Sequence, residues 1–61
     1  MITGETIKAA RDRIGESQSQ FAERFGVNQS TIHRWEVDGP PPGGPARKMI
    51  EQIVSQIAEA A

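Results

Sequence analysis

The residues best suited to chemistry lie together in the middle of the chain, where six of the seven positions 28–34 carry hydrogen-bonding side chains. An amide such as that of Gln29 donates and accepts at once, which matches the edge that adenine presents in the major groove of DNA. The guanidinium of Arg34 donates two parallel hydrogen bonds, which match guanine O6 and N7. These groups indicate recognition of base edges, and the other members of the cluster are Asn28, Ser30, Thr31 and His33.

Catalysis and metal binding have little support in the same sequence. There is no cysteine and His33 is the single histidine, so an ordinary zinc site would lack ligands. His33 is also the one candidate base for the serines, and it shares a helical surface with Ser30. The Gly-rich segment 40–45 lacks the lysine of a phosphate-binding loop. We therefore predict no enzymatic activity, no metal and no cofactor.

A helix over residues 18–25 is predicted to precede the polar cluster. Ser17 and Gln20 have the spacing of a capping box, in which each side chain bonds the backbone N–H of the other residue. Gly26 then ends the helix, because glycine tolerates the positive φ of a sharp turn. The chain can thus change direction immediately before the cluster.

The polar cluster itself is predicted to form a second helix over residues 29–37. Asn28 is the expected N-cap of this helix. Ile32 and Trp35 recur at i, i+3 spacing and would bury one side of it, which leaves the hydrogen-bonding groups on the other side. Two helices joined by a tight turn make residues 17–36 a helix-turn-helix.

Two longer helices complete the predicted fold, over residues 3–14 and 45–58. Pro45 suits the first position of the last helix, and a Pro/Gly-rich loop over residues 39–45 separates that helix from the motif. No apolar run is long enough for a membrane span. We therefore predict one compact, all-α, four-helix domain over residues 1–61.

Six short motifs occur together in the region from about residue 3 to residue 39. They are Ser17-Gln18, Phe21-Ala22, Gly26-Val27, Asn28-Gln29-Ser30-Thr31-Ile32, Arg34-Trp35-Glu36 and Gly39. As a joint pattern they resemble the lambda-repressor-like, Cro/C1-type (XRE) helix-turn-helix regulators. The resemblance implies sequence-specific binding of double-stranded DNA, with the helix over residues 29–37 in the major groove.

The resemblance also assigns roles to single positions. It places Gln29, Ser30 and Arg34 at base-reading positions, with Asn28 and His33 as auxiliary contacts. Phosphate contacts are expected near helix N-termini, and the resemblance places Gln18 and Thr31 there. Independently of the resemblance, Arg47 and Lys48 follow Pro45 at the start of the last predicted helix and are further candidates. In the family an Arg of the first helix commonly pairs with the Glu that ends the recognition helix. The residues that match this structural ion pair are Arg11 and Glu36.

The charge of the chain favours a second subunit. Seven Lys and Arg against eight Asp and Glu give a formal net charge of −1, so general attraction to phosphate is weak. The last helix has an apolar stripe wider than one small core needs, which predicts a homodimer on a palindromic operator. The expected interface residues are Met49, Ile53, Val54 and Ile57, and an intramolecular core is the alternative for this stripe.

At this small size the resemblance implies a phage-type repressor, or a small repressor encoded beside phage, antitoxin or anti-defence genes, without a small-molecule sensor. We expect such a regulator to act in the cytoplasm of a bacterial or phage-infected cell. An antitoxin-like or other protein-interaction module that uses the C-terminal helix is the alternative. The polar cluster discriminates between the two, because a pure interaction module has no use for Gln29, Thr31 and Arg34 together.

Overall fold

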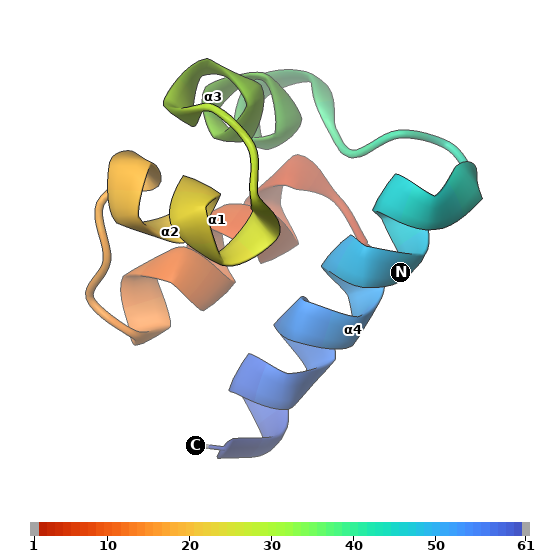
Figure 1. Cartoon of the computed structure of the whole chain (residues 1–61). Coiled ribbons are helices and arrows are strands. Elements are labelled where there is room, and N and C mark those ends of the chain that lie inside the picture. The colour runs from red at the N-terminus through yellow and green to blue at the C-terminus, as the bar shows by residue number, and fades with distance from the viewer. Residues whose placement is uncertain (1, 61) are drawn as a thin grey trace.

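The computed structural model describes residues 2–60, and this part of the chain folds into four α-helices (Figure 1). The helices are α1 (Gly4–Arg13), α2 (Gln18–Phe25), α3 (Gln29–Asp38) and α4 (Gly44–Ala60). No strand occurs within residues 2–60, so the predicted all-α, four-helix fold is confirmed. The predicted boundaries differ most at the end of α4, which lies at residue 60 rather than 58.

The helices are arranged so that two separate surfaces remain at the ends of the molecule. α3 packs against both α2 and α1, and α4 packs against α1. Figure 1 shows α3 at one end of the molecule and the C-terminal end of α4 at the other. The outer side of α3 and the C-terminal half of α4 are therefore two separate surfaces.

Capping boxes begin the first two helices. Before α2, Gln20 N–H donates to Ser17 Oγ at 3.1 Å, and Ser17 N–H donates to Gln20 Oε1 at 2.9 Å, as the sequence predicts. Before α1, Thr3 and Thr6 exchange the same pair of hydrogen bonds. These contacts satisfy backbone donors that the first turn of a helix leaves without partners.

Asn28 is the N-cap of α3, as predicted. Asn28 occupies the N-cap position with an extended backbone, but its side chain makes no capping hydrogen bond. The main-chain carbonyl of Asn28 instead accepts from the N–H groups of Thr31 and Ile32, at 3.0 and 3.4 Å. The exposed amide of Asn28 is therefore left to face solvent.

The turn of the motif depends on one glycine and one alanine. Gly26 ends α2 with φ +67°, a left-handed conformation that residues with a Cβ adopt reluctantly. A Cβ at this position would meet no atom within 4 Å, so the requirement is conformational and not one of space. Ala22 is 2% exposed beneath the turn, and its carbonyl accepts from Val27 N–H at 3.1 Å.

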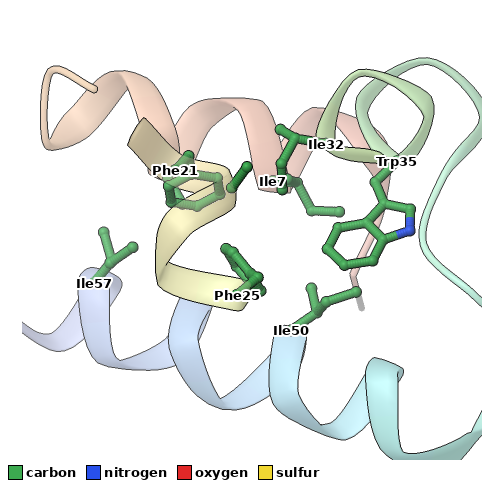
Figure 2. Packing of buried hydrophobic residues seen from close by; sticks show 9 residues of the cluster. Ile7, Phe21, Phe25, Ile32, Trp35, Ile50 and Ile57 are labelled. Carbon is green, nitrogen blue, oxygen red and sulfur yellow. The ribbon is translucent and has the colours of Figure 1, made fainter. Parts of the chain in front are cut away.

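A single hydrophobic core joins the four helices, and each helix contributes one fully buried side chain (Figure 2). These side chains are Ile7, Phe21, Ile32 and Ile50. Phe25 lies edge-on against both Phe21 and Trp35, with ring centroids 4.9 and 5.6 Å apart, an arrangement that aromatic pairs favour. Because Phe25 belongs to α2 and Trp35 to α3, this contact holds the two helices of the motif together.

The apolar stripe of α4 is divided between the core and the surface. Ile57 is 8% exposed and belongs to the core, in keeping with the intramolecular alternative, and its place in a dimer interface stays a prediction. Ile57 is buried because α1 lies along this edge of α4, where Ala10 and Ile57 line the same hollow. Three other members of the stripe are only partly buried, and they are Met49, Ile53 and Val54.

Gly4 allows the start of α1 to approach the end of α3 unusually closely. A Cβ at this position would collide with the main-chain oxygen of Glu36 and would lie 2.9 Å from that of Trp35. These neighbours are backbone atoms and cannot rotate away as a side chain can. The close approach positions the C-terminal end of α3, and the sequence reasoning did not identify it.

Candidate nucleic-acid interface

The outer side of α3 carries the side chains predicted to read bases. Ile32 and Trp35 are 0% and 8% exposed on the inner side, so the polar groups of the helix are turned to solvent. Ser30, His33 and Arg34 share one helical face through their i+3 and i+4 spacing. All five residues predicted to read bases are exposed, and they are Asn28, Gln29, Ser30, His33 and Arg34. The structure gathers them at one surface, and their role in base reading stays a prediction.

Val37 belongs to the same surface, although the sequence reasoning missed it. Its side chain is 66% exposed, which is unusual for a large hydrophobic residue. Val37 follows His33 by four positions and Arg34 by three, and this spacing is the signal that could have identified it. In a major groove, an apolar side chain can contact the methyl group of thymine.

An ion pair with α1 anchors the C-terminal end of α3. Arg11 Nε donates to Glu36 Oε2 at 2.7 Å, and Arg11 Nη2 donates to Glu36 Oε1 at 3.2 Å. Arg11 Nη1 also donates to the main-chain carbonyl of Glu16 at 3.0 Å, so one side chain braces α3 and the segment that leads into α2. A bidentate contact of this kind fixes orientation as well as distance.

The carboxyl group of Glu36 is charged despite its burial. Only 6% of the side chain is exposed, and this desolvation raises its pKa. The hydrogen bonds from Arg11 and Gln18, together with the positive charges of Arg11 and Lys8, lower the pKa by more. The resulting pKa lies below the usual value of 4.5, so at neutral pH both oxygens of Glu36 act as hydrogen-bond acceptors.

Gln18 connects this buried carboxylate to the outer side of α3. Its Nε2 donates to Glu36 Oε1 at 3.0 Å, and its Oε1 accepts from Gln29 Nε2 at 2.6 Å. The side chain expected to lie over the DNA backbone is therefore also a bridge between two residues of α3. The sequence reasoning missed this bridge because Gln18 and Glu36 are 18 positions apart and no local pattern joins them.

The two cations at the start of α4 have different surroundings. Arg47 donates to the main-chain carbonyl of Pro41 at 3.0 Å and pairs with Glu51 at 3.2 Å. These contacts hold Arg47 against the loop and partly neutralise its charge. Lys48 is exposed and forms no ion pair within residues 2–60, so it is better suited than Arg47 to contact a phosphate.

The positive charge available to a nucleic acid is limited. Three of the seven Lys and Arg residues form ion pairs with Glu. In the part of the chain that the structure describes, four cations form none, and they are Lys8, Arg13, Arg34 and Lys48. Arg34 is the one cation on α3, so the recognition surface depends more on directed hydrogen bonds than on a strong positive field.

A metal cluster and a membrane-spanning helix were both sought among residues 2–60. No group of three or more His, Cys, Asp and Glu side chains among them could hold a metal ion. The helices in this part of the chain also lack the combination of length and hydrophobicity that a membrane span requires.

Comparison with known proteins agrees with this geometry. A family model described as helix-turn-helix matches residues 7–60, from within α1 to the end of α4. No curated protein and no solved structure matches the chain. The matched region includes the glycine turn, the exposed polar side of α3 and the helices that support them. The chain therefore belongs to the Cro/C1-type (XRE) helix-turn-helix family of DNA-binding proteins.

Proposed function

We propose that this protein is a sequence-specific transcriptional regulator that binds double-stranded DNA with α3 in the major groove. The observation that carries the proposal is the exposed polar side of α3, on a helix held from behind by buried Ile32 and Trp35. A helix of ten residues is about 15 Å long, and the major groove, about 12 Å wide, admits a helix of ordinary diameter. Rigid support matters because base contacts require side chains at fixed hydrogen-bond distances.

Base recognition is divided among the exposed side chains. Gln29 suits adenine and Arg34 suits guanine, and each good bidentate contact is worth about 1–3 kcal/mol of discrimination. Ser30 can bond to any of several bases, whereas Asn28 and His33 supply auxiliary contacts. Around the groove, phosphate contacts come from Thr31, Gln18 and Lys48, with a smaller contribution from Arg47.

The protein acts as a repressor that occupies a palindromic operator overlapping a promoter, in the cytoplasm of a bacterial or phage-infected cell. A formal net charge of −1 gives one subunit little general affinity for phosphate. Two copies on half-sites about 34 Å apart would double the directed contacts. A homodimer thus offsets the weak electrostatic attraction of the single chain.

The dimer interface that we propose is the partly buried stripe of α4. Two hollows of about 500 and 200 Å³ flank the C-terminal half of this helix, one beside Ile53 and the other beside Val54. Together with Met49, these side chains can bury further apolar surface against a second copy. Ile53→Asp and Val54→Asp are expected to give a monomer by sedimentation, with a large loss of operator affinity. If either variant stays dimeric, the dimer interface lies elsewhere on the molecule.

Selection of bound duplexes from a random pool tests the DNA-reading surface, and it should enrich a sequence with two-fold symmetry. On that operator, Arg34→Ala and Gln29→Ala should each weaken binding by about 5- to 160-fold, while the helicity stays unchanged. Arg34→Lys is the matched control, because it keeps the positive charge but loses the planar, bidentate geometry of the guanidinium. It should retain non-specific affinity and weaken the guanine preference. Wild-type affinity in both alanine variants would show that α3 does not read bases.

A protein-interaction module, similar to an antitoxin, is the second candidate. The partly buried side chains Met49, Ile53 and Val54 favour it, because the same stripe could bind another protein. In that case substitutions on α4 would abolish binding of the partner protein, and substitutions of Gln29 or Arg34 would leave that binding intact. Parallel assays of the two sets of variants distinguish the candidates.

A further inference from the structure

A continuous chain of four polar side chains runs from the buried ion pair to the outer side of α3. Arg11 donates to both oxygens of Glu36, and Gln18 Nε2 donates to Glu36 Oε1 at 3.0 Å. Gln29 Nε2 then donates to Gln18 Oε1 at 2.6 Å. The chain begins at a carboxylate that is 6% exposed and ends at a residue on the predicted base-reading surface.

The direction of these hydrogen bonds is fixed at the buried end. A guanidinium can only donate, and an ionised carboxylate can only accept. Gln18 must therefore present its NH2 group, and not its oxygen, to Glu36. The oxygen of the Gln18 amide then faces Gln29, and this oxygen can only accept a hydrogen bond. The partner atom of Gln29 must be a donor, as the structure shows.

This direction determines which atoms Gln29 has left for a base. One N–H of its amide is used on Gln18, so the free groups are the carbonyl oxygen and the second N–H. One acceptor beside one donor complements adenine, which offers the N6 amino group and N7. With the amide reversed, Gln29 would use its oxygen on Gln18 and would present its NH2 group. Two donors complement guanine, which offers the acceptors O6 and N7.

We infer that Glu36 is a positioning residue that makes Gln29 select adenine over guanine, acting through the amide of Gln18. The inference rests on the proposed function, because it assumes that Gln29 contacts a base. It adds a second role to the ion pair, which then sets the hydrogen-bonding direction of the surface as well as holding α3 against α1.

Glu36→Gln provides a sharp test because it should reverse the chain of hydrogen bonds. A glutamine at this position has one oxygen, and we expect that oxygen to keep the shorter contact, with Arg11 Nε at 2.7 Å, which turns the NH2 group toward Gln18. The Gln18 amide then presents its oxygen to that group and its own NH2 to Gln29. Gln29 would accept from Gln18 and present two donors to the base.

The experiment compares binding to two operators that differ at the base pair read by Gln29. That pair is identified as the position where Gln29→Ala no longer distinguishes adenine from guanine. The wild-type protein should prefer adenine by about tenfold or more. Glu36→Gln should prefer guanine or bind the two operators within about threefold of each other. The ratio of the two affinities is the readout, because a loss of stability alone would weaken both complexes together.

Two further variants make the test decisive. Glu16→Gln is the matched control, because the side chain of Glu16 also pairs with an arginine but lies outside the chain of hydrogen bonds, which Glu16 touches only through its main-chain carbonyl. This variant should keep the wild-type ratio of the two affinities. Gln18→Met keeps the Arg11–Glu36 pair and frees the Gln29 amide to rotate, so it should lower the ratio even if Glu36→Gln fails to fold.

The outcomes separate this inference from the broader proposal. Enrichment of an operator, followed by an unchanged adenine-to-guanine ratio in folded Glu36→Gln or in Gln18→Met, would overturn the inference and leave DNA recognition by α3 intact. If the wild-type protein enriched no duplex, the proposed function would itself be wrong. A reduced or reversed ratio in Glu36→Gln, with a wild-type ratio in Glu16→Gln, would support the inference.

Discussion

Two arginine–glutamate pairs in this molecule have similar hydrogen-bond geometry and different surroundings. Two nitrogens of Arg11 lie 2.7 and 3.2 Å from the oxygens of Glu36, and two nitrogens of Arg24 lie 2.8 and 2.7 Å from those of Glu16. The side chains of the first pair are 14% and 6% exposed, whereas those of the second are 47% and 21% exposed. The comparison separates the effect of burial from that of hydrogen-bond geometry.

Burial changes what each pair does for the protein. Water and salt compete for the Arg24–Glu16 pair, which joins α2 to the segment just before it, so it contributes little to folding. The Arg11–Glu36 pair joins α1 to the end of α3 across 25 positions of sequence. Removal of one partner would leave the other charge in a poorly solvated site, which is costly. The same chemical contact is thus a local surface feature in one place and part of the support of α3 in the other.

The largest difference is expected when the arginine of each pair is removed. Arg11→Ala should lower the free energy of unfolding by about 3 kcal/mol, because Glu36 remains buried and charged. A domain of this length has a total stability of roughly 3–9 kcal/mol, so much of the protein would unfold. Arg24→Ala should change the stability little, since Glu16 stays in contact with water. Urea denaturation followed by circular dichroism measures both, and equal losses would contradict the assigned role of burial.

A somewhat smaller effect is expected from Gly4→Ala, which tests the same contact of α1 with α3 through the backbone. The new Cβ would collide with the main-chain oxygens of Glu36 and Trp35, so the two helices must separate. We expect a loss of about 2 kcal/mol in the free energy of unfolding, measured in the same way. Gly43→Ala is the control, because a Cβ there meets no atom within 4 Å. The prediction fails if the two variants are equally stable.

Local sequence patterns were sufficient to predict most of the fold. The capping box of Ser17 and Gln20 and the turn at Gly26 depend on neighbouring residues, and both occur in the structure. Asn28 was correctly predicted as the N-cap of α3, but its residue type does not determine whether the side chain or the main-chain carbonyl accepts the hydrogen bonds there. The exposed position of Val37 could have been predicted from its spacing to Arg34.

Contacts between distant segments could not be predicted in the same way. Nothing near Gly4 in sequence shows that its Cα faces the end of α3, because that depends on how two helices cross. The bridge from Gln18 to Glu36 likewise exists only after α2 and α3 have packed. The periodicity of α4 predicted an apolar stripe, but not that α1 would cover the edge with Ile57. Arg11 and Glu36 were singled out through the family resemblance.

Acid should reduce the difference in the free energy of unfolding between the wild-type protein and Arg11→Ala. In the wild type, burial raises the pKa of Glu36 but the bonds from Arg11 and Gln18 lower it further, to below 4.5. This stabilisation is complete above about pH 4.5 and is lost as the pH falls through the folded pKa. Without Arg11, burial dominates and the pKa should rise above its usual value, so protonation relieves the buried charge. The stability difference should therefore narrow by more than half between about pH 7 and pH 3.

Urea denaturation at a series of pH values measures this narrowing, and Glu36→Gln is the control. This variant has no carboxyl group to titrate at position 36, so its own profile should lack the contribution of Glu36. Glu16 also has a lowered pKa, because of the hydrogen bonds from Arg24, and it contributes to the acid sensitivity of every variant that retains both residues. A difference between the wild type and Arg11→Ala that stays constant with pH would mean that Glu36 remains well solvated without its partner.

The smallest effect is expected from salt, which should act on one pair and not on the other. The Debye length falls from about 10 Å at 0.1 M to about 3 Å at 1 M ionic strength, but this screening acts through the solvent around exposed charges. Double-mutant cycles to alanine at each salt concentration isolate the coupling within each pair. The coupling of Arg24 with Glu16 should fall toward zero, whereas that of Arg11 with Glu36 should be largely retained. If both couplings fell in parallel, water would reach the Arg11–Glu36 pair as freely as the surface pair. Burial would then not explain how the end of α3 is held against α1.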